Sequence, residues 1–127
     1  EFYQFPKLQM SPGLKSRLPI LIGGMSDAAL RRAARNDGWA GAQHEISELE
    51  ELLPKLKEYR GELGRSLDDF DIGIGLYQPT DENINRCREL GVTILYREAF
   101  CDENGMASKM SLKEKMRNMD QFAQRYL

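Results

Sequence analysis

The feature that most constrains the fold is a regular alternation of two kinds of segment along the chain. A short apolar segment is followed by a segment with helical spacing, and this pair occurs four times in 127 residues. Strands joined through helices form right-handed crossovers and lie parallel in one sheet. The sequence therefore predicts an α/β fold, with four successive strand-helix units around one parallel sheet.

The predicted strands differ in their pattern. The first is continuously apolar and ends at Gly23 and Gly24, which is the form of a strand buried on both faces. The third has a period of two, so Gly73 and Gly75 share one face, where we expect another group to approach closely. The predicted strands are residues 19–22, 39–41, 70–77 and 92–96.

The predicted helices begin at residues that cap helix ends. Ser26 precedes a stripe of alanines at helical spacing, and Thr80 precedes the third helix. Ser47 with Glu50, and Ser111 with Glu114, match the capping-box pattern. Pro54 is expected to kink or split the second helix because proline lacks an amide donor.

Two stretches predict irregular structure: the lead-in, residues 1–18, and a polar loop, residues 97–110. The terminal helix that follows has one apolar face, formed by Leu112, Met116, Met119, Phe122, Ala123 and Tyr126. We treat residues 1–127 as a single domain.

Composition excludes several classes of protein. The chain is 41% hydrophobic and 30% charged, as soluble globular domains are, and its net charge of -2 gives no field that would attract nucleic acid. No apolar run approaches the roughly 20 residues that span a membrane. Cys87 and Cys101 have no C-x-x-C spacing and no histidine cluster, so we expect free thiols, a cytoplasmic location and no metal site.

Residues 19–35, PILIGGMSDAALRRAAR, are followed by Asp37-Gly38-Trp39. This string resembles the C-terminal signature of the luciferase-like monooxygenase family, especially of its deazaflavin-using members. Further segments fall in the family's order and approximate spacing: residues 2–5, 63–65, 70–72, 90–93 and 122–123.

The resemblance implies a barrel fold, and it implies that this chain contains only part of the active site. Family members are eight-stranded β/α (TIM-type) barrels, and such a barrel needs about 250 residues. This chain then corresponds to the C-terminal half-barrel, and its start without Met suggests part of a longer protein. The family's proton-handling His and Glu lie mostly in the other half, so we assign no catalytic residue and expect the isolated chain to be inactive. Open sheet edges favour a homo-oligomer or pairing with the missing N-terminal half-barrel.

The candidate site is the turn that follows the first strand. Gly23 and Gly24 allow a tight turn, and the amides leading through Met25 into Ser26 lie at the positive end of a helix, where anions bind. The resemblance implies that the anion is the phosphate of FMN or of the deazaflavin coenzyme (factor 420). The alternative is that the glycines only make a tight turn and Ser26 only caps. Met25 departs from the more polar residue expected at this position.

Three further residues have both a functional and a structural interpretation. Trp39 either lines the cofactor pocket at the carboxyl end of its strand or packs within the barrel or at an interface. His44, the only histidine, is predicted in the loop after that strand, as a general base, a substrate contact or an ordinary surface residue. Arg97 follows the last strand and either holds an anionic substrate group or forms a solvated pair with Glu98.

The sequence therefore predicts the cofactor-phosphate-binding half of a flavin- or deazaflavin-dependent oxidoreductase or monooxygenase that acts on a small organic substrate. One alternative is a stand-alone half-barrel that serves as a ligand-binding or structural, oligomerising module. Another is a phosphate-binding half-barrel of unrelated activity, because a barrel does not by itself determine chemistry.

Overall fold

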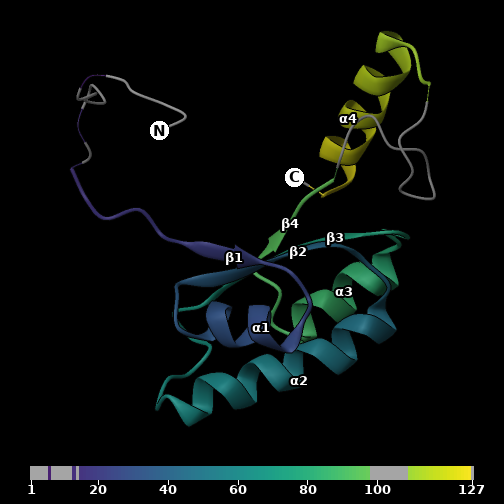
Figure 1. The fold of residues 1–127 in the computed structure, drawn as a ribbon. Helices are drawn as coiled ribbons and strands as arrows, with labels where there is room; N and C mark the ends of the chain where they lie inside the picture. Colours follow the sequence, from purple (N-terminus) through teal and green to yellow (C-terminus); the bar gives the residue numbers. More distant parts are fainter. Residues whose placement is uncertain (1–5, 7–12, 14, 98–108, 127) are drawn as a thin grey trace.

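Figure 1 shows a computed structural model of the chain, which describes residues 6, 13, 15–97 and 109–126. The elements follow in the order β1 (Leu21–Gly23), α1 (Asp27–Ala34), β2 (Gly38–His44), α2 (Ile46–Glu62), β3 (Asp71–Leu76), α3 (Asp81–Glu89), β4 (Ile94–Leu95) and α4 (Leu112–Tyr126). The predicted succession of four strand-helix units is confirmed.

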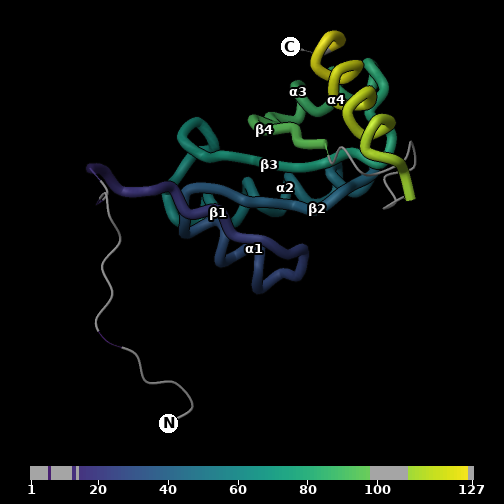
Figure 2. The backbone as a smooth tube through the Cα atoms, turned by 90° about the horizontal axis from the view of Figure 1, so that it is seen from above, coloured from purple at the N-terminus to yellow at the C-terminus, as the bar shows by residue number. Residues whose placement is uncertain are grey.

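The strands form one parallel sheet in the order β1-β2-β3-β4, so neighbours in the chain are neighbours in the sheet. Helices α1, α2 and α3 lie together on one side of this sheet (Figure 1), and the view in Figure 2 shows the strands side by side in chain order. A sheet that advances one strand at a time, with its crossover helices on one face, is the arrangement found in half of a TIM-type barrel.

The core lies between the sheet and the helices. Ile22, Trp39 and Ile72 are register partners across β1, β2 and β3, and the last two are completely or almost completely buried. Helix α2 contributes an apolar stripe to the core. The core cluster includes Leu30, Ala33, Ala34, Trp39, Leu49, Leu53, Leu56, Phe70, Ile72, Ile74 and Leu76.

The other face of the sheet carries small residues. Gly23, Ala40, Gly73 and Ile94 are in register across the four strands, and the Ile94 side chain is 42% exposed. A Cβ atom at Gly75 would lie 3.1 Å from Cγ of Gln43 and 3.3 Å from Cε2 of Tyr96. The close approach predicted at the glycines of the third strand is therefore confirmed at this position.

Two strand predictions need correction. The first strand is not buried on both faces, because β1 is an edge strand and its Leu21 and Ile22 are only half-buried. The second strand is longer than predicted and continues to His44, which the sequence placed in a loop. A register shift between Ala40 and Gln43 interrupts the alternation of buried and exposed side chains along β2. The sequence pattern therefore did not predict the second half of this strand.

The capping box of α2 was predicted two residues too late. Helix α2 begins at Ile46 with Glu45 as its N-cap, and the Glu45 amide donates to Oε2 of Glu48 at 3.1 Å. The predicted split at Pro54 is also wrong, since α2 is continuous through this residue. Pro54 lies on the exposed face, where water can satisfy the Glu50 carbonyl that lacks its helical donor.

The third unit follows its predicted capping. The Thr80 side chain accepts a hydrogen bond from the Asn83 amide, and Gly91 ends the helical segment with a φ of 85°. Strand β4 is shorter than the predicted residues 92–96 and contains only Ile94 and Leu95. In the polar loop predicted at 97–110, residues 98–108 lie outside the described part of the chain, as does Cys101, whereas Cys87 is a buried free thiol.

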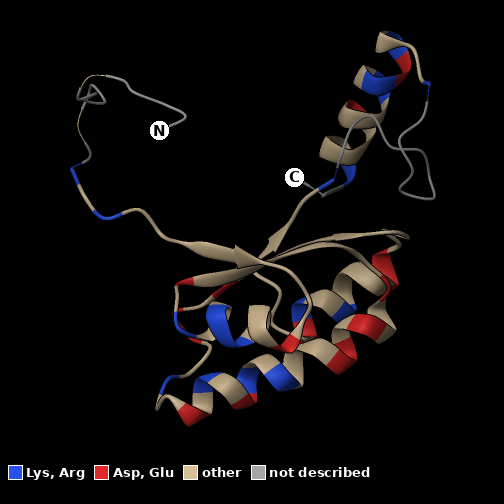
Figure 3. Cartoon of the chain, viewed as in Figure 1, with Lys and Arg blue, Asp and Glu red and all other residues tan. Residues whose placement is uncertain are grey.

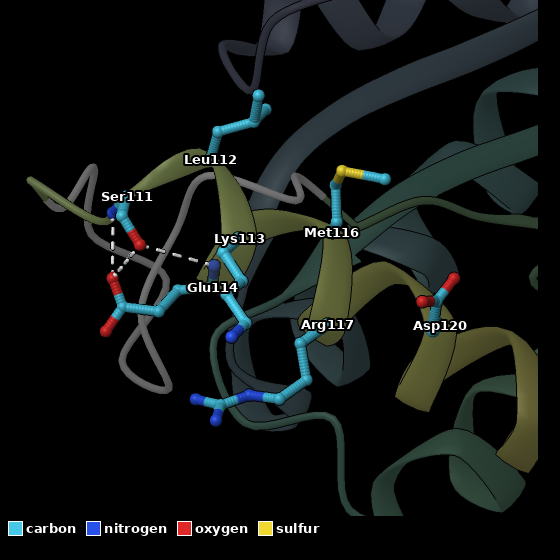
Figure 4. Close-up of a pocket in the computed structure, with 7 residues that line it drawn as sticks. All are labelled: Ser111, Leu112, Lys113, Glu114, Met116, Arg117 and Asp120. Atoms are coloured by element: carbon cyan, nitrogen blue, oxygen red, sulfur yellow. Dashed lines mark hydrogen bonds between the residues drawn. The ribbon is translucent and has the colours of Figure 1, made fainter.

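Helix α4 lies outside the layer of α1, α2 and α3 (Figure 1), but its Arg125 forms an ion pair with Asp81 at the start of α3, at 2.6 Å. Ser111 caps it as predicted: the Ser111 amide donates to Glu114 Oε2 at 2.8 Å, and the Glu114 amide donates to Ser111 Oγ at 3.4 Å. Leu112 and Met116 project to one side of the helix and Arg117 to another (Figure 4). Leu112, Met116 and Met119 of the predicted apolar face are exposed.

Candidate functional site

The predicted site residues gather at one edge of the sheet, where the parallel strands end. Gly23 ends β1, His44 ends β2, and Arg97 lies two residues beyond β4. The four strands contain a single charged residue, Asp71, which lies at the opposite edge of the sheet. Most Lys, Arg, Asp and Glu residues of this part of the chain lie on the helices that cover the sheet (Figure 3). The carboxyl edge of such a sheet is where barrel enzymes place their ligands.

The turn from β1 into α1 has a conformation that requires glycine. Gly24 has a φ of 103°, and a Cβ atom there would lie 3.0 Å from the Cβ of Ala29. Ser26 caps α1 as predicted: its Oγ accepts from the Ala29 amide at 3.3 Å, and its carbonyl accepts from the Leu30 amide at 2.9 Å. The Ser26 hydroxyl hydrogen remains available to a second acceptor.

Two backbone donors of this turn are free of protein partners: within the described part of the chain, the N–H groups of Met25 and Ser26 donate to no protein acceptor. Both residues are exposed, with the Met25 side chain at 53%. Two exposed amide donors, a hydroxyl and the N-terminus of α1 therefore lie within four successive residues.

Trp39 contacts this turn from inside the core. Its side chain is 0% exposed, so its ring offers no surface to a ligand in this structure. Its indole Nε1–H donates a hydrogen bond of 2.8 Å to the Gly24 carbonyl. Trp39 is the second residue of β2, so the prediction that it lies at the carboxyl end of its strand is wrong. Of the two interpretations of Trp39, the structure shows packing in the core, together with a direct bond to the candidate site.

His44 is not the surface-loop residue that the sequence predicted. It is 1% exposed, its Nδ1 lies 3.2 Å from Oε2 of Glu48, and its ring centroid lies 5.5 Å from that of Trp39. Its Nε2 is buried and has no hydrogen-bond partner among the described residues. The ring faces the core, so a contact with substrate would require it to move.

Arg97 lies at the edge where the sequence placed it. It is partly buried, and Glu98, its suggested partner, lies outside the described residues. The structure thus puts Gly23, Gly24, Met25 and Ser26 together in one turn, with Trp39 bonded to it. His44 packs against Trp39 at the end of β2, and Arg97 lies beyond the end of β4.

A cluster that sequence reasoning missed holds the N-terminus of α1 against α2. The Tyr59 hydroxyl donates to Asp27 Oδ1, and the Arg31 guanidinium lies 3.9 Å from the centre of the Tyr59 ring. The Tyr59 bond is the main cause that lowers the pKa of Asp27, and the Asp27 carboxylate raises the pKa of Tyr59. No sequence signal joined Tyr59 to a residue 32 positions away.

Asp37, which precedes β2, lies at the opposite edge. Its carboxylate accepts two hydrogen bonds of 2.8 Å from Arg17 and one of 2.7 Å from the Ile20 amide. These bonds lower its pKa, with Arg17 as the main cause. Asp37 therefore ties the residues before β1 to the start of β2 and takes no part in the turn.

The fold and the turn define a class: half of a β/α barrel with an exposed glycine turn after the first strand of its sheet. A family model described as luciferase-like monooxygenase matches residues 1–125. The chain belongs to this family.

Similar proteins include uncharacterized proteins of Mycobacterium bovis and Mycobacterium tuberculosis, each 37% identical over 125 residues. The match covers 98% of this chain and 43% of each relative, so the chain spans less than half the length of these proteins. Among solved structures, a coenzyme F420 dependent tetrahydromethanopterin reductase from Methanopyrus kandleri is 27% identical, with a TM-score of 0.41 over 48% of this chain and 17% of the reductase.

No helix in the described part of the chain is long and apolar enough to cross a membrane. No group of three or more His, Cys, Asp or Glu residues in residues 15–97 and 109–126 is arranged to hold a metal ion.

Proposed function

We propose that this chain is the cofactor-anchoring half of a flavin- or deazaflavin-dependent oxidoreductase that acts on a small organic substrate. The observation that carries the proposal is the turn of residues 23–26, with its positive φ at Gly24 and its exposed amides at Met25 and Ser26. Membership of the luciferase-like family supports a cofactor of this kind.

The phosphate of FMN, or of the side arm of the deazaflavin coenzyme, suits this turn. The amides of Met25 and Ser26 would donate to its oxygens, the Ser26 hydroxyl would add a third donor, and the N-terminus of α1 would favour its charge. The bound cofactor supplies the redox chemistry, either by hydride transfer or by activating oxygen. In this proposal the chain holds and orients the cofactor.

Proton handling falls to residues that this chain does not provide by itself. Arg97 is the candidate for an anionic group of the substrate, because it lies at the same edge of the sheet as the turn. A homo-oligomer, or pairing with an N-terminal half-barrel, would complete the site. We place the protein in the cytoplasm, in keeping with its free thiol at Cys87.

A stand-alone half-barrel with a ligand-binding or oligomerising role is the second candidate. It is favoured by the exposed apolar side chains of Ile94 and Tyr96 on the open face of the sheet, and of Leu112 on α4. Such surfaces mark sites of association.

Titration with FMN and with riboflavin, which lacks the phosphate, tests the cofactor-anchoring function. We expect FMN to bind at least roughly tenfold more tightly than riboflavin, because charge-assisted bonds to the phosphate are made only by FMN. The deazaflavin coenzyme is titrated in parallel. Equal affinity for FMN and riboflavin, with no binding of the deazaflavin coenzyme, would exclude a phosphate site at this turn and leave the second candidate.

Two glycine variants locate the site. Gly24→Ala introduces a side chain at a φ of 103° and 3.0 Å from Ala29, so it should remove most of the preference for FMN. Gly64→Ala is the matched control, since its φ of 66° is also positive but nothing lies within 4 Å of the added Cβ. It should cost stability and leave the preference for FMN unchanged.

A further inference from the structure

Trp39 joins the second strand to the turn that follows the first. It pairs in register with Ile22 on β1, and its indole Nε1–H donates to the Gly24 carbonyl at 2.8 Å, 15 residues earlier in the chain. A buried tryptophan normally finds one partner for its single donor. Here that partner is the one backbone carbonyl that precedes the exposed amide of Met25.

The bond at Gly24 determines where the next amide points. A trans peptide is planar, so the carbonyl of Gly24 and the N–H of Met25 project in opposite directions from one rigid unit. The indole holds the carbonyl toward the core, and the Met25 N–H therefore points away from the indole. Gly24 has a φ of 103°. Because glycine has no Cβ atom, many other backbone conformations are open to this residue without the bond.

The indole itself is held tightly. A Cβ atom at Gly41 would lie 2.7 Å from Cη2 of Trp39 and 2.7 Å from Nε2 of His44, so only glycine leaves room for both rings. The His44 ring packs at 5.5 Å from that of Trp39, and its Nδ1 lies 3.2 Å from Glu48 on the first turn of α2. Residues from β2 and α2 thus determine the position of the indole donor.

We propose that Trp39 is a positioning residue for the anion-binding turn: its indole N–H orients the Gly24–Met25 peptide so that the Met25 amide faces the bound phosphate. The inference rests on the proposed function, because it needs a phosphate at the turn. It replaces the predicted contact between Trp39 and the cofactor with a role that acts through Gly24. Trp39 affects the phosphate alone and has no effect on the rest of the ligand.

Trp39→Phe tests the inference, because phenylalanine keeps an aromatic ring in the core and removes the donor. The affinity for FMN should fall roughly tenfold, the effect of one lost hydrogen bond, while the affinity for riboflavin stays unchanged. A purely structural role would weaken both ligands alike. Phe70→Leu is the matched control: Phe70 is also a buried aromatic residue, but it precedes β3 at the opposite edge of the sheet.

The wild-type protein provides a second measurement that does not depend on how a variant folds. Trp39 is the only tryptophan, so the indole N–H gives a single proton signal in a nitrogen-15 correlated spectrum. We expect this proton to exchange slowly with solvent and to exchange still more slowly when FMN is added, whereas riboflavin has no such effect. Fast exchange in the FMN complex would overturn the inference.

The outcomes distinguish a failure of the proposed function from a failure of the role of Trp39 alone. If wild-type protein does not prefer FMN over riboflavin, the proposed function fails and the role of Trp39 fails with it. If the wild type prefers FMN and folded Trp39→Phe retains the full preference, only the role of Trp39 is overturned. Loss of the preference in Trp39→Phe, with Phe70→Leu unaffected, supports both.

Discussion

At the scale of single residues, the candidate turn depends on partners that lie far away in the chain. Ser26 and Gly24 follow from local rules, since one is a preferred N-cap residue and the other adopts a positive φ. Trp39 and Tyr59 act on the same segment from β2 and α2, by bonds to Gly24 and Asp27. The turn is thus held from both sides by hydrogen bonds of buried rings.

The bond between Tyr59 and Asp27 predicts a specific dependence of stability on pH. The folded pKa of Asp27 is lowered, so its contribution is complete above the unfolded value of about 4 and is lost as pH falls through the folded pKa. The folded pKa of Tyr59 is raised, so its contribution is complete below about 10 and is lost as pH rises. Tyr59→Phe should therefore reduce the loss of stability at both extremes of pH.

Urea midpoints from pH 2 to 11 measure this effect, with Tyr77→Phe as the control. Asp37 and Glu114 also have lowered pKa values, from Arg17 and Ser111 respectively, so an acid-dependent loss remains in every variant. Parallel pH profiles for the wild type and Tyr59→Phe would contradict the assigned bond.

The residues of the turn were predictable from the sequence, and their supporting contacts were not. The apolar run, the two glycines and the Ser26 cap are local signals, and the structure has the turn and the cap where they were expected. The burial of His44 follows from an irregular β2 that pairs with β3 beyond a register shift. That pairing joins residues more than 30 positions apart, and no local pattern encodes it.

At the scale of elements, α2 shows how tertiary packing overrides a local signal. Its buried stripe of Leu49, Leu53, Leu56 and Tyr59 runs past Pro54 on the opposite, exposed side. Burial of this stripe stabilises the helix on both sides of the proline, although the proline removes one helical hydrogen bond. The helix therefore remains continuous where its sequence alone predicts a break.

Replacement of this proline should stabilise the protein. Pro54→Ala restores the donor to the Glu50 carbonyl and removes the clash of the ring with the preceding turn, which together cost about 3 kcal/mol in a helix interior. Because α2 already accommodates the ring, we expect a gain of about 1–2 kcal/mol in the free energy of unfolding. Urea unfolding measures it, and Glu51→Ala is the control at a neighbouring exposed position of the same helix.

An unchanged or lower stability of Pro54→Ala would contradict this account. It would mean that the proline stabilises α2 by restricting the unfolded chain more than it disturbs the helix. The comparison therefore decides which effect of Pro54 on the free energy of unfolding is larger: the loss of a helical hydrogen bond or the restriction of the unfolded chain.

At the scale of the whole molecule, the half-barrel leaves surfaces that a complete barrel would cover. In the described sheet, β1 and β4 each have only one neighbouring strand, and the face opposite α1, α2 and α3 carries no helix layer. Helix α4 adds Leu112, Met116 and Met119, whose side chains are more than half exposed. Edges and apolar patches of this kind lead to association.

We therefore expect the isolated chain to associate as its concentration rises, which sedimentation velocity between about 1 and 100 µM would detect. Changing Met116 and Met119 together to lysine should shift the population toward the monomer, because charged side chains cannot be buried at the new interface without cost. Lys113→Ala on the same helix is the control and should leave association unchanged. A monomer at every concentration would show that the open face and α4 do not bind a second copy, and co-purification with an N-terminal half-barrel would then be the decisive measurement.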